Sequence, residues 1–174
     1  DVMLVQVGAV SSGVAALRGG RIQGAILSYP NLIQARREGF RELLDIASLG
    51  VPYASTGITV RKSFMAQRRD VVVNYVKSIV EATARIKRDK AFTIEMMMKY
   101  FRTKDREMME ETYEVSVAKY LKRVPTPTAE SFRTVIDELA LVNPKAKGQD
   151  PKRFYDESIL QELDKSGFIN ALNR

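Results

Sequence analysis

The sequence predicts an α/β protein that is rich in helix, on three observations. Short apolar runs at residues 2–7, 24–28 and 43–46 are typical of strands, and a short helical pattern separates each from the next. Strand, helix, strand, helix, strand at such intervals indicates a layered fold with partly parallel pairing. From Lys62 onward, apolar residues recur every three or four positions, which is typical of amphipathic helices.

The elements of the first third follow from local signals. Ser11 or Ser12 caps a helix that Gly19 and Gly20 stop, and Pro30 suits the first turn of a second helix that ends at Gly39. Residues 51–60 carry β-type residues interrupted by proline and glycine. They predict an extended connector rather than a central strand.

The remainder predicts five helices. They are expected at residues 70–90, 91–101 and 105–121, from Thr128 or Ser131 to Asn143, and at 159–165. Amphipathic helices need a surface to cover, and the predicted strands look too few to serve them all.

Composition restricts the chemistry. The chain has 174 residues, 45% of them hydrophobic, and no apolar run approaches the length of a membrane helix, so we expect a soluble protein. It has no cysteine and no histidine, which removes disulfides, thiolates, the usual general base near pH 7 and most zinc and iron sites. We therefore predict no enzyme, no catalytic residue, no metal and no cofactor.

The net charge is +7. A nucleic-acid surface and an electrostatic funnel for an anionic ligand are two functional explanations, and a solvated basic surface is a third. Lys and Arg are scattered among Asp and Glu, which favours the solvated surface and no nucleic-acid partner.

One loop is a candidate ligand site. Ser28, Tyr29, Pro30 and Asn31 follow the carboxyl end of a predicted parallel strand and lead into a helix N-terminus, an edge at which α/β sheets bind ligands. Ser and Asn offer hydrogen bonds, and Tyr offers a stacking face. An ordinary capped loop is the alternative explanation.

Several segments stand in a recognisable order: residues 16–25 (ALRGGRIQGA), Ser28–Pro30, Glu38–Arg41 before 43–45, and the tail Phe154–Ser158 with its following leucines and Ser166-Gly167-Phe168. This order resembles the ABC-transporter solute-binding proteins of the nitrate/sulfonate/taurine type. One departure is Gln23-Gly24, where the family often has Asp-Ala, so a turn role for that Asp is unsupported.

The resemblance implies the C-terminal portion of a type II periplasmic binding fold. Residues 1–52 would end the second lobe, 53–60 would cross the hinge, and 61–174 would be the helical part of the first lobe. Tyr53 and Ser55, at that hinge, form a second, weaker group of ligand-binding candidates. Because Asp1 directly precedes a strand-like run, we expect a fragment whose isolated form self-associates, either by exchanging helices or by pairing strand edges at residues 2–7. Alternatively, the helices after Lys62 collapse into a bundle of their own.

The function implied is capture of a small polar or anionic organic ligand between two lobes and its delivery to an ABC permease in the membrane. The location implied is periplasmic or extracellular, with a membrane anchor through a missing N-terminal segment as one form. The alternative is the ligand-sensing effector domain of a transcription regulator. An enzyme of the pyrimidine-precursor-synthesis type needs histidine chemistry, which this chain lacks.

Overall fold

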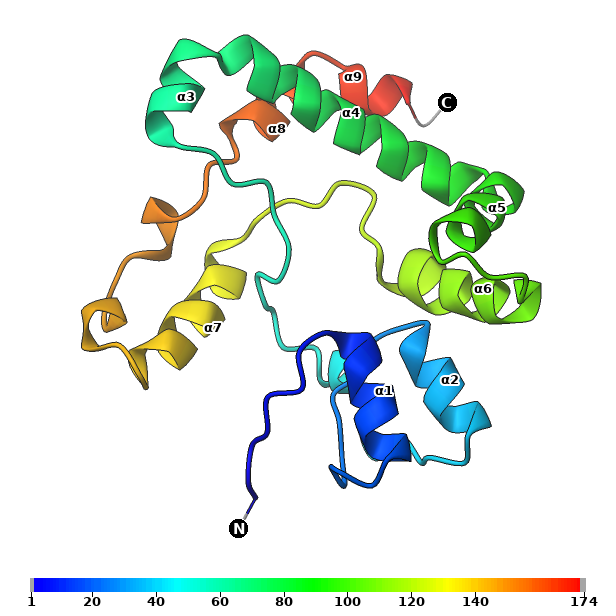
Figure 1. Cartoon of the computed structure of the whole chain (residues 1–174). Coiled ribbons are helices and arrows are strands. Elements are labelled where there is room, and N and C mark those ends of the chain that lie inside the picture. Colours follow the sequence, from blue (N-terminus) through cyan, green and yellow to red (C-terminus); the bar gives the residue numbers. More distant parts are fainter. Residues whose placement is uncertain (1, 173–174) are drawn as a thin grey trace. The chain divides into compact units, whose positions relative to one another are not determined.

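The computed structural model of the chain describes residues 2–172, and every regular element in that range is helical (Figure 1). The helices belong to two units, each built from two stretches of chain. Unit 1 comprises Asp1–Asp45 and Asp89–Leu121, and unit 2 comprises Ile46–Arg88 and Lys122–Arg174.

Unit 1 contains two helical pairs. The elements are α1 (Val10–Arg18), α2 (Asn31–Arg37), α5 (Lys90–Tyr100), α6 (Arg106–Tyr113) and η2 (Glu114–Tyr120). Helix α1 packs on α2, and α5 packs on α6. The last of these elements, η2, is a π-helical continuation of α6, so the hydrogen-bond spacing widens along one continuous helical segment.

The core of unit 1 is small. Ile94 on α5 and Met109 on α6 are its largest fully buried side chains, and Val14 and Ile33 are buried on α1 and α2. Aspartates cap both later helices, because Asp89 accepts from the amide of Phe92 and Asp105 from that of Met108.

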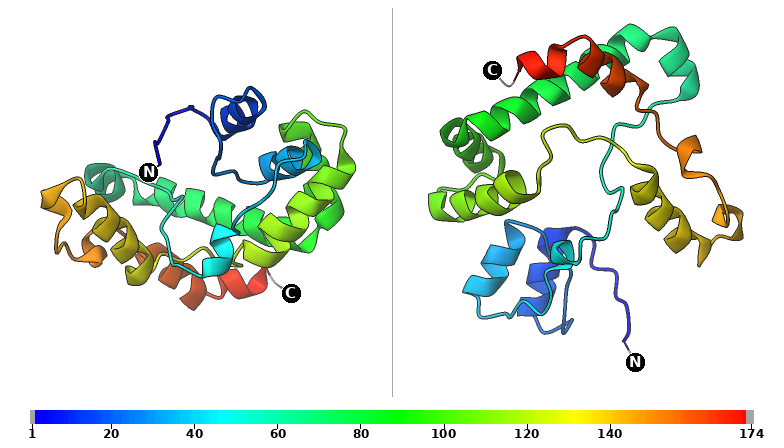
Figure 2. Two further views of the ribbon diagram at one scale, coloured as in Figure 1. Left: turned by 90° about the horizontal axis from the view of Figure 1, so that it is seen from below. Right: turned by 180° about the vertical axis from the view of Figure 1, so that it is seen from behind.

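Unit 2 is built around one long helix. Its elements are η1 (Ile46–Leu49), α3 (Lys62–Gln67), α4 (Arg69–Arg88), α7 (Ala129–Ala140), η3 (Pro144–Ala146), η4 (Pro151–Arg153), α8 (Ser158–Lys165) and α9 (Phe168–Ala171). Figure 2 shows α8 and α9, orange to red, lying along the green α4, and α4 contacts α8.

Apolar side chains hold α4 to the C-terminal helices. Val72 and Val80 on α4 are buried against Ile159 and Leu163 on α8 and Ile169 on α9. The two valines are eight residues apart on α4, so they lie on one face of it. This confirms the amphipathic pattern that the sequence showed for residues 70–90.

The connector of residues 51–60 is extended, as predicted, and its first half contacts α7. The amide of Ala54 donates to the carbonyl of Ser131 at 3.2 Å, and the hydroxyl of Tyr53 donates to the carboxylate of Glu138 at 3.0 Å. Hydrogen bonding to Glu138 raises the pKa of Tyr53. After the connector, the structure confirms the five helices that the sequence predicts at residues 70–90, 91–101, 105–121, from Thr128 or Ser131 to Asn143, and 159–165.

The α/β prediction is wrong, and so is the type II periplasmic binding fold that the resemblance implied. Residues 2–172 contain no strand and no sheet. The predicted strands at 2–7 and 24–28 lack regular structure, and Ile46, in the third, begins η1. An extended segment becomes a strand only when a neighbour exchanges hydrogen bonds with it, and none of these segments pairs with another.

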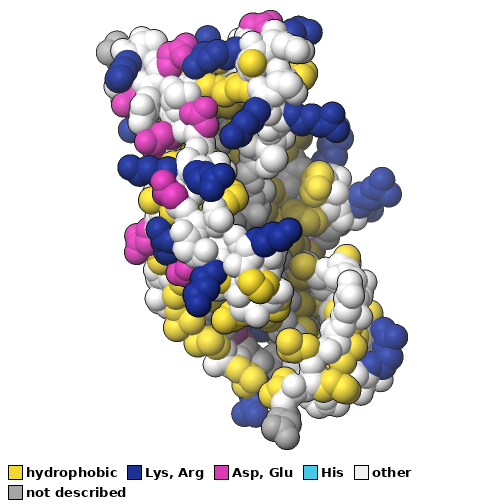
Figure 3. Space-filling view, turned by 90° about the vertical axis from the view of Figure 1, so that its left-hand side faces the viewer, with side chains coloured by type: hydrophobic (Ala, Val, Ile, Leu, Met, Phe, Trp, Pro, Cys, Tyr) yellow, Lys and Arg dark blue, Asp and Glu magenta, His cyan; other side chains and the backbone are white. Residues whose placement is uncertain are grey.

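As a result, unit 1 exposes apolar residues that a sheet would bury. Leu4 is 94% exposed, Leu43 87% and Ile26 81%. Figure 3 shows, on one face of the molecule, hydrophobic side chains that are open to solvent. No helix among the described residues is long and apolar enough to cross a membrane.

Candidate functional site

The predicted ligand loop, residues 28–31, leads directly into α2. The carbonyl of Ser28 accepts from the amide of Leu32 at 3.1 Å, and that of Pro30 accepts from the amide of Ile33 at 3.0 Å. Pro30 is buried, Tyr29 and Asn31 are half-buried, and Ser28 is exposed. The structure therefore gives the loop the helix-starting position that the sequence predicted, without the preceding strand.

Two cations lie within electrostatic range of Tyr29. One is Arg36, one helical turn into α2, and the other is Lys119 on the π-helical η2. π-Helical turns often occur at functional sites, because the wider turn changes the direction of side chains. We define the Tyr29 cluster as Tyr29, Arg36, Lys119 and the groups that these two cations contact.

Arg36 forms two ion pairs. It donates to Glu42, which follows α2, and to Glu111 of α6 at 3.1 Å. The hydrogen bond to Glu42 is the main cause of the raised pKa of Arg36, and partial burial opposes it. The side chain remains 40% exposed, so a ligand can reach it.

Lys119 is less firmly paired. Its Nζ lies 3.9 Å from the Oδ2 of Asp45 and 4.6 Å from the ring centre of Tyr120. The Tyr120 hydroxyl donates to the same Asp45 oxygen at 3.1 Å. Hydrogen bonding to Tyr120 is the main cause of the raised pKa of Lys119, with smaller contributions from Asp45 and Tyr29.

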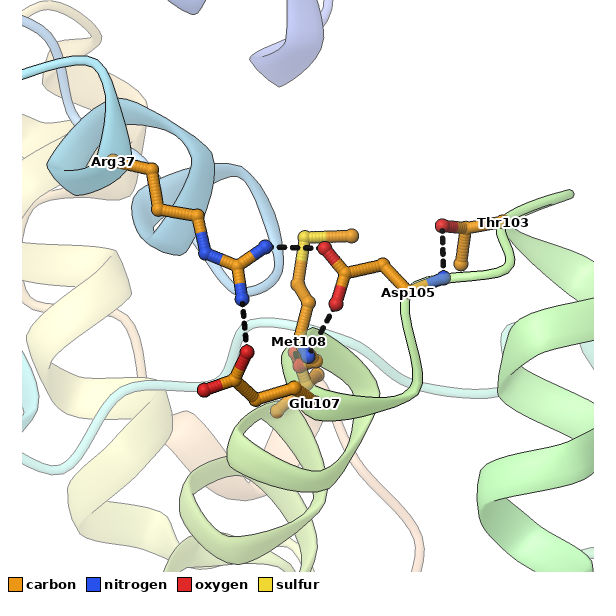
Figure 4. A network of polar contacts seen from close by, with 6 residues as sticks. Arg37, Thr103, Asp105, Glu107 and Met108 are labelled. Atoms are coloured by element: carbon orange, nitrogen blue, oxygen red, sulfur yellow. Dashed lines mark hydrogen bonds and ion pairs between the residues drawn. The ribbon is translucent and has the colours of Figure 1, made fainter.

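A neighbouring network holds α2 to α6. Arg37 donates to Asp105 and, at 3.3 Å, to Glu107, while the hydroxyl of Thr103 accepts from the Asp105 amide (Figure 4). Asp105 also caps α6 through Met108. The network holds the start of α6 against the end of α2. It therefore also helps to position Arg36 relative to η2, the continuation of α6 that contains Lys119.

The second predicted group, Tyr53 and Ser55, belongs to unit 2 rather than to the unit of the loop. Tyr53 is bonded to Glu138 of α7, and Ser55 is exposed. Sequence reasoning missed Arg36, Lys119, Tyr120 and Asp45 as site residues. The motif around Tyr29 has no local link to a lysine 90 positions away, so no sequence signal pointed to Lys119.

Unit 2 has an open pocket of about 400 Å³ between α4, α8 and α9. Val73, Leu163 and Phe168 supply its apolar lining, and Lys77 and Glu162 its charges. Both charged groups already have partners, since Lys77 lies over the ring of Phe168 and Glu162 accepts from Arg69 at 2.8 Å. The Tyr29 cluster has more charged groups than this pocket, since Arg36 and Lys119 are paired with three carboxylates.

Among residues 2–172, no group of three or more acidic side chains is placed to hold a metal ion. Comparison of the chain with protein-family models, with curated proteins and with solved structures found no match. The function must therefore be argued from the residues themselves.

Proposed function

We propose that this chain binds a small polar organic ligand without transforming it, as the solute-binding component of an ABC import system. The observation that carries the proposal is the position of Tyr29, in the loop that leads into α2, together with the through-space influence of Tyr29 that helps to raise the pKa of both Arg36 and Lys119. A phenol ring can enclose a ligand, and the two cations can orient its polar groups.

The charges of the Tyr29 cluster favour one kind of ligand. Arg36 and Lys119 are accompanied by three carboxylates, Glu42, Glu111 and Asp45. A purely anionic ligand would have to displace or approach these carboxylates. A zwitterion can place its acidic group at Lys119 and its ammonium group at Asp45, so the cluster favours a small zwitterion over a simple anion.

The same groups are suited to binding rather than to proton transfer. The pKa values of Arg36 and Lys119 are raised, so both side chains stay charged at neutral pH. A permanently protonated group binds and orients an anionic group but cannot act as a general base. The chain has no histidine to take that role.

The transport role rests on the sequence motifs that resemble the solute-binding proteins and not on the fold, because residues 2–172 are helical and lack that family's sheet. On this proposal the partner is an ABC permease in the membrane, and the site of action is periplasmic or extracellular. The proposal needs only the Tyr29 cluster of unit 1 as its site.

Calorimetry of the purified chain tests the proposal with three matched probes. They are taurine, which carries both charges, methanesulfonate, which is only anionic, and ethylamine, which is only cationic. We expect taurine to bind most tightly. Tyr29→Ala should weaken that binding at least about tenfold while leaving the unfolding midpoint nearly unchanged, because Tyr29 is only half-buried.

Tyr75→Ala is the matched control, because Tyr75 is an exposed tyrosine on α4 of the other unit. It should leave binding unchanged. A Tyr53→Ala variant examines the second predicted group in the same assay. The proposal is wrong if none of the three probes binds, or if Tyr29→Ala and Tyr75→Ala bind taurine equally well.

A further inference from the structure

Three segments of unit 1 lack regular secondary structure and have main-chain groups free for pairing. They are residues 2–7, 22–27 and 41–44. Within the described range 2–172, none of them makes a main-chain hydrogen bond. Extended chain with free N–H and C=O groups is a template on which another strand can pair.

The first of these segments is also the most exposed. Val2, Met3 and Leu4 are each more than four-fifths exposed. Water can satisfy the free main-chain groups, but it does not compensate for exposed apolar side chains. A contact that covers both therefore gains hydrogen bonds and apolar burial together.

The chain as a whole exposes more surface than its size requires. Its accessible surface is 12966 Å². Two separate compact bodies of the sizes of unit 1 and unit 2 would expose roughly 10,000 Å² in total. The excess of roughly 2,500 Å² is spread over both units, and the exposed side chains of Val2, Met3, Leu4 and Val5 are part of it.

Charge allows two copies of unit 1 to approach each other. Unit 1 has eleven Lys and Arg and eleven Asp and Glu, so its net charge is zero, and the whole +7 belongs to unit 2. Residues 2–17 contain no charged residue and no proline. Natural sheet edges that must stay single usually have lysine or proline to prevent pairing, and this segment has neither.

We propose that residues 2–7 form a homodimerisation edge, in which the segment pairs antiparallel with the same segment of a second copy. A two-fold axis through a non-hydrogen-bonded pair of Leu4 with the partner copy's Leu4 places Val5 opposite the partner copy's Met3 and Val2 opposite its Gln6, so the contact is self-complementary. Gly8 follows with a φ of 84°, which turns the chain out of the extended direction and ends the ladder.

Sedimentation velocity of the 174-residue chain over a range of concentrations tests the proposal. We expect a monomer–dimer equilibrium, with backbone amides of residues 2–7 protected from hydrogen exchange only at concentrations where the dimer forms. Leu4→Lys should raise the dimer dissociation constant at least about tenfold, since it places two charges in the contact. Val5→Pro should do the same, because proline removes an N–H that the ladder needs.

Leu141→Lys is the matched control, because Leu141 is 85% exposed but lies beyond the C-terminus of α7 in unit 2. It should leave the dimer intact. Leu4 and Val5 lie outside every helix of residues 2–172, so circular dichroism of each variant should show unchanged helix content. A chain that stays monomeric, a dimer that Leu4→Lys and Leu141→Lys weaken equally, or amides of 2–7 that exchange freely in the dimer would each overturn the proposal.

Discussion

Arg37, at the end of α2, donates a hydrogen bond to Asp105, the residue that caps the N-terminus of α6. The Asp105 carboxylate thus accepts a hydrogen bond at each oxygen, one from the Met108 amide and the other from Arg37. The residues are 68 positions apart, so this pair links the two stretches of chain that make up unit 1.

The first prediction concerns pH. Bonding to the Met108 amide, and then to Arg37, holds the pKa of Asp105 below its ordinary value of 3.8. A carboxylate with a depressed folded-state pKa stabilises the fold above the ordinary value, and this stabilisation is lost as the pH falls through the folded-state pKa. We expect wild type to be more stable than Asp105→Asn at pH 7, and the difference to shrink steadily below about pH 4.

Urea unfolding at a series of pH values measures this difference. Asp137→Asn, which changes an exposed carboxylate on α7, is the control and should show a smaller difference at pH 7. A difference for Asp105→Asn that stays constant down to pH 2 would show that the carboxylate charge has no part in holding α2 to α6.

The second prediction concerns the start of α7. The Thr128 hydroxyl accepts from the Ser131 amide at 3.2 Å, and the Ser131 hydroxyl is bonded in return to the Thr128 amide. Thr128→Ala removes the cap and should lower the free energy of unfolding by about 1 kcal/mol. Thr134→Ala, inside the same helix, removes only a bond to the Glu130 carbonyl and should cost clearly less. Equal losses in urea unfolding would contradict this account.

The third prediction concerns the core of unit 2. Leu163 is 2% exposed and packs between α4 and α9, so Leu163→Ala should cost about 2–5 kcal/mol through lost burial and the cavity left behind. Leu141→Ala, at an exposed leucine, should change stability by less than about 0.5 kcal/mol. Denaturant unfolding followed by circular dichroism compares them, and a Leu163→Ala loss below 1 kcal/mol would mean that α8 is not held as described.

The fourth prediction concerns ligand association. Because unit 1 has no net charge, the Tyr29 cluster lacks a long-range field that would attract an anion. The association rate of taurine should change by less than about twofold between low and physiological ionic strength. Stopped-flow tyrosine fluorescence measures the rate. A steep fall with added salt would instead indicate steering by the basic side chains of unit 2.

The helices could be predicted from the sequence, because their signals are local. The spacing of Val72, Val76 and Val80 identifies one face of α4 whatever packs against it. Strands could not be predicted in the same way, because an apolar run such as residues 2–7 indicates extended chain but does not specify the segment with which that chain would pair.

Part of the site could be predicted from local signals, since Pro30 and Asn31 indicate the start of a helix. The inclusion of Lys119 could not be predicted, because only the folding of α6 and η2 against α2 brings this lysine near Tyr29.

The chain passes between the two units after Asp45, Arg88 and Leu121, so neither unit is contiguous in the sequence. Helix α4 is therefore translated well before its partner α8, whose first residue is Ser158. The ribosome needs roughly 4–14 s to add the intervening 70 or so residues. For that interval the apolar face with Val72 and Val80 emerges uncovered, and it is the part of the nascent chain on which a holdase chaperone would act.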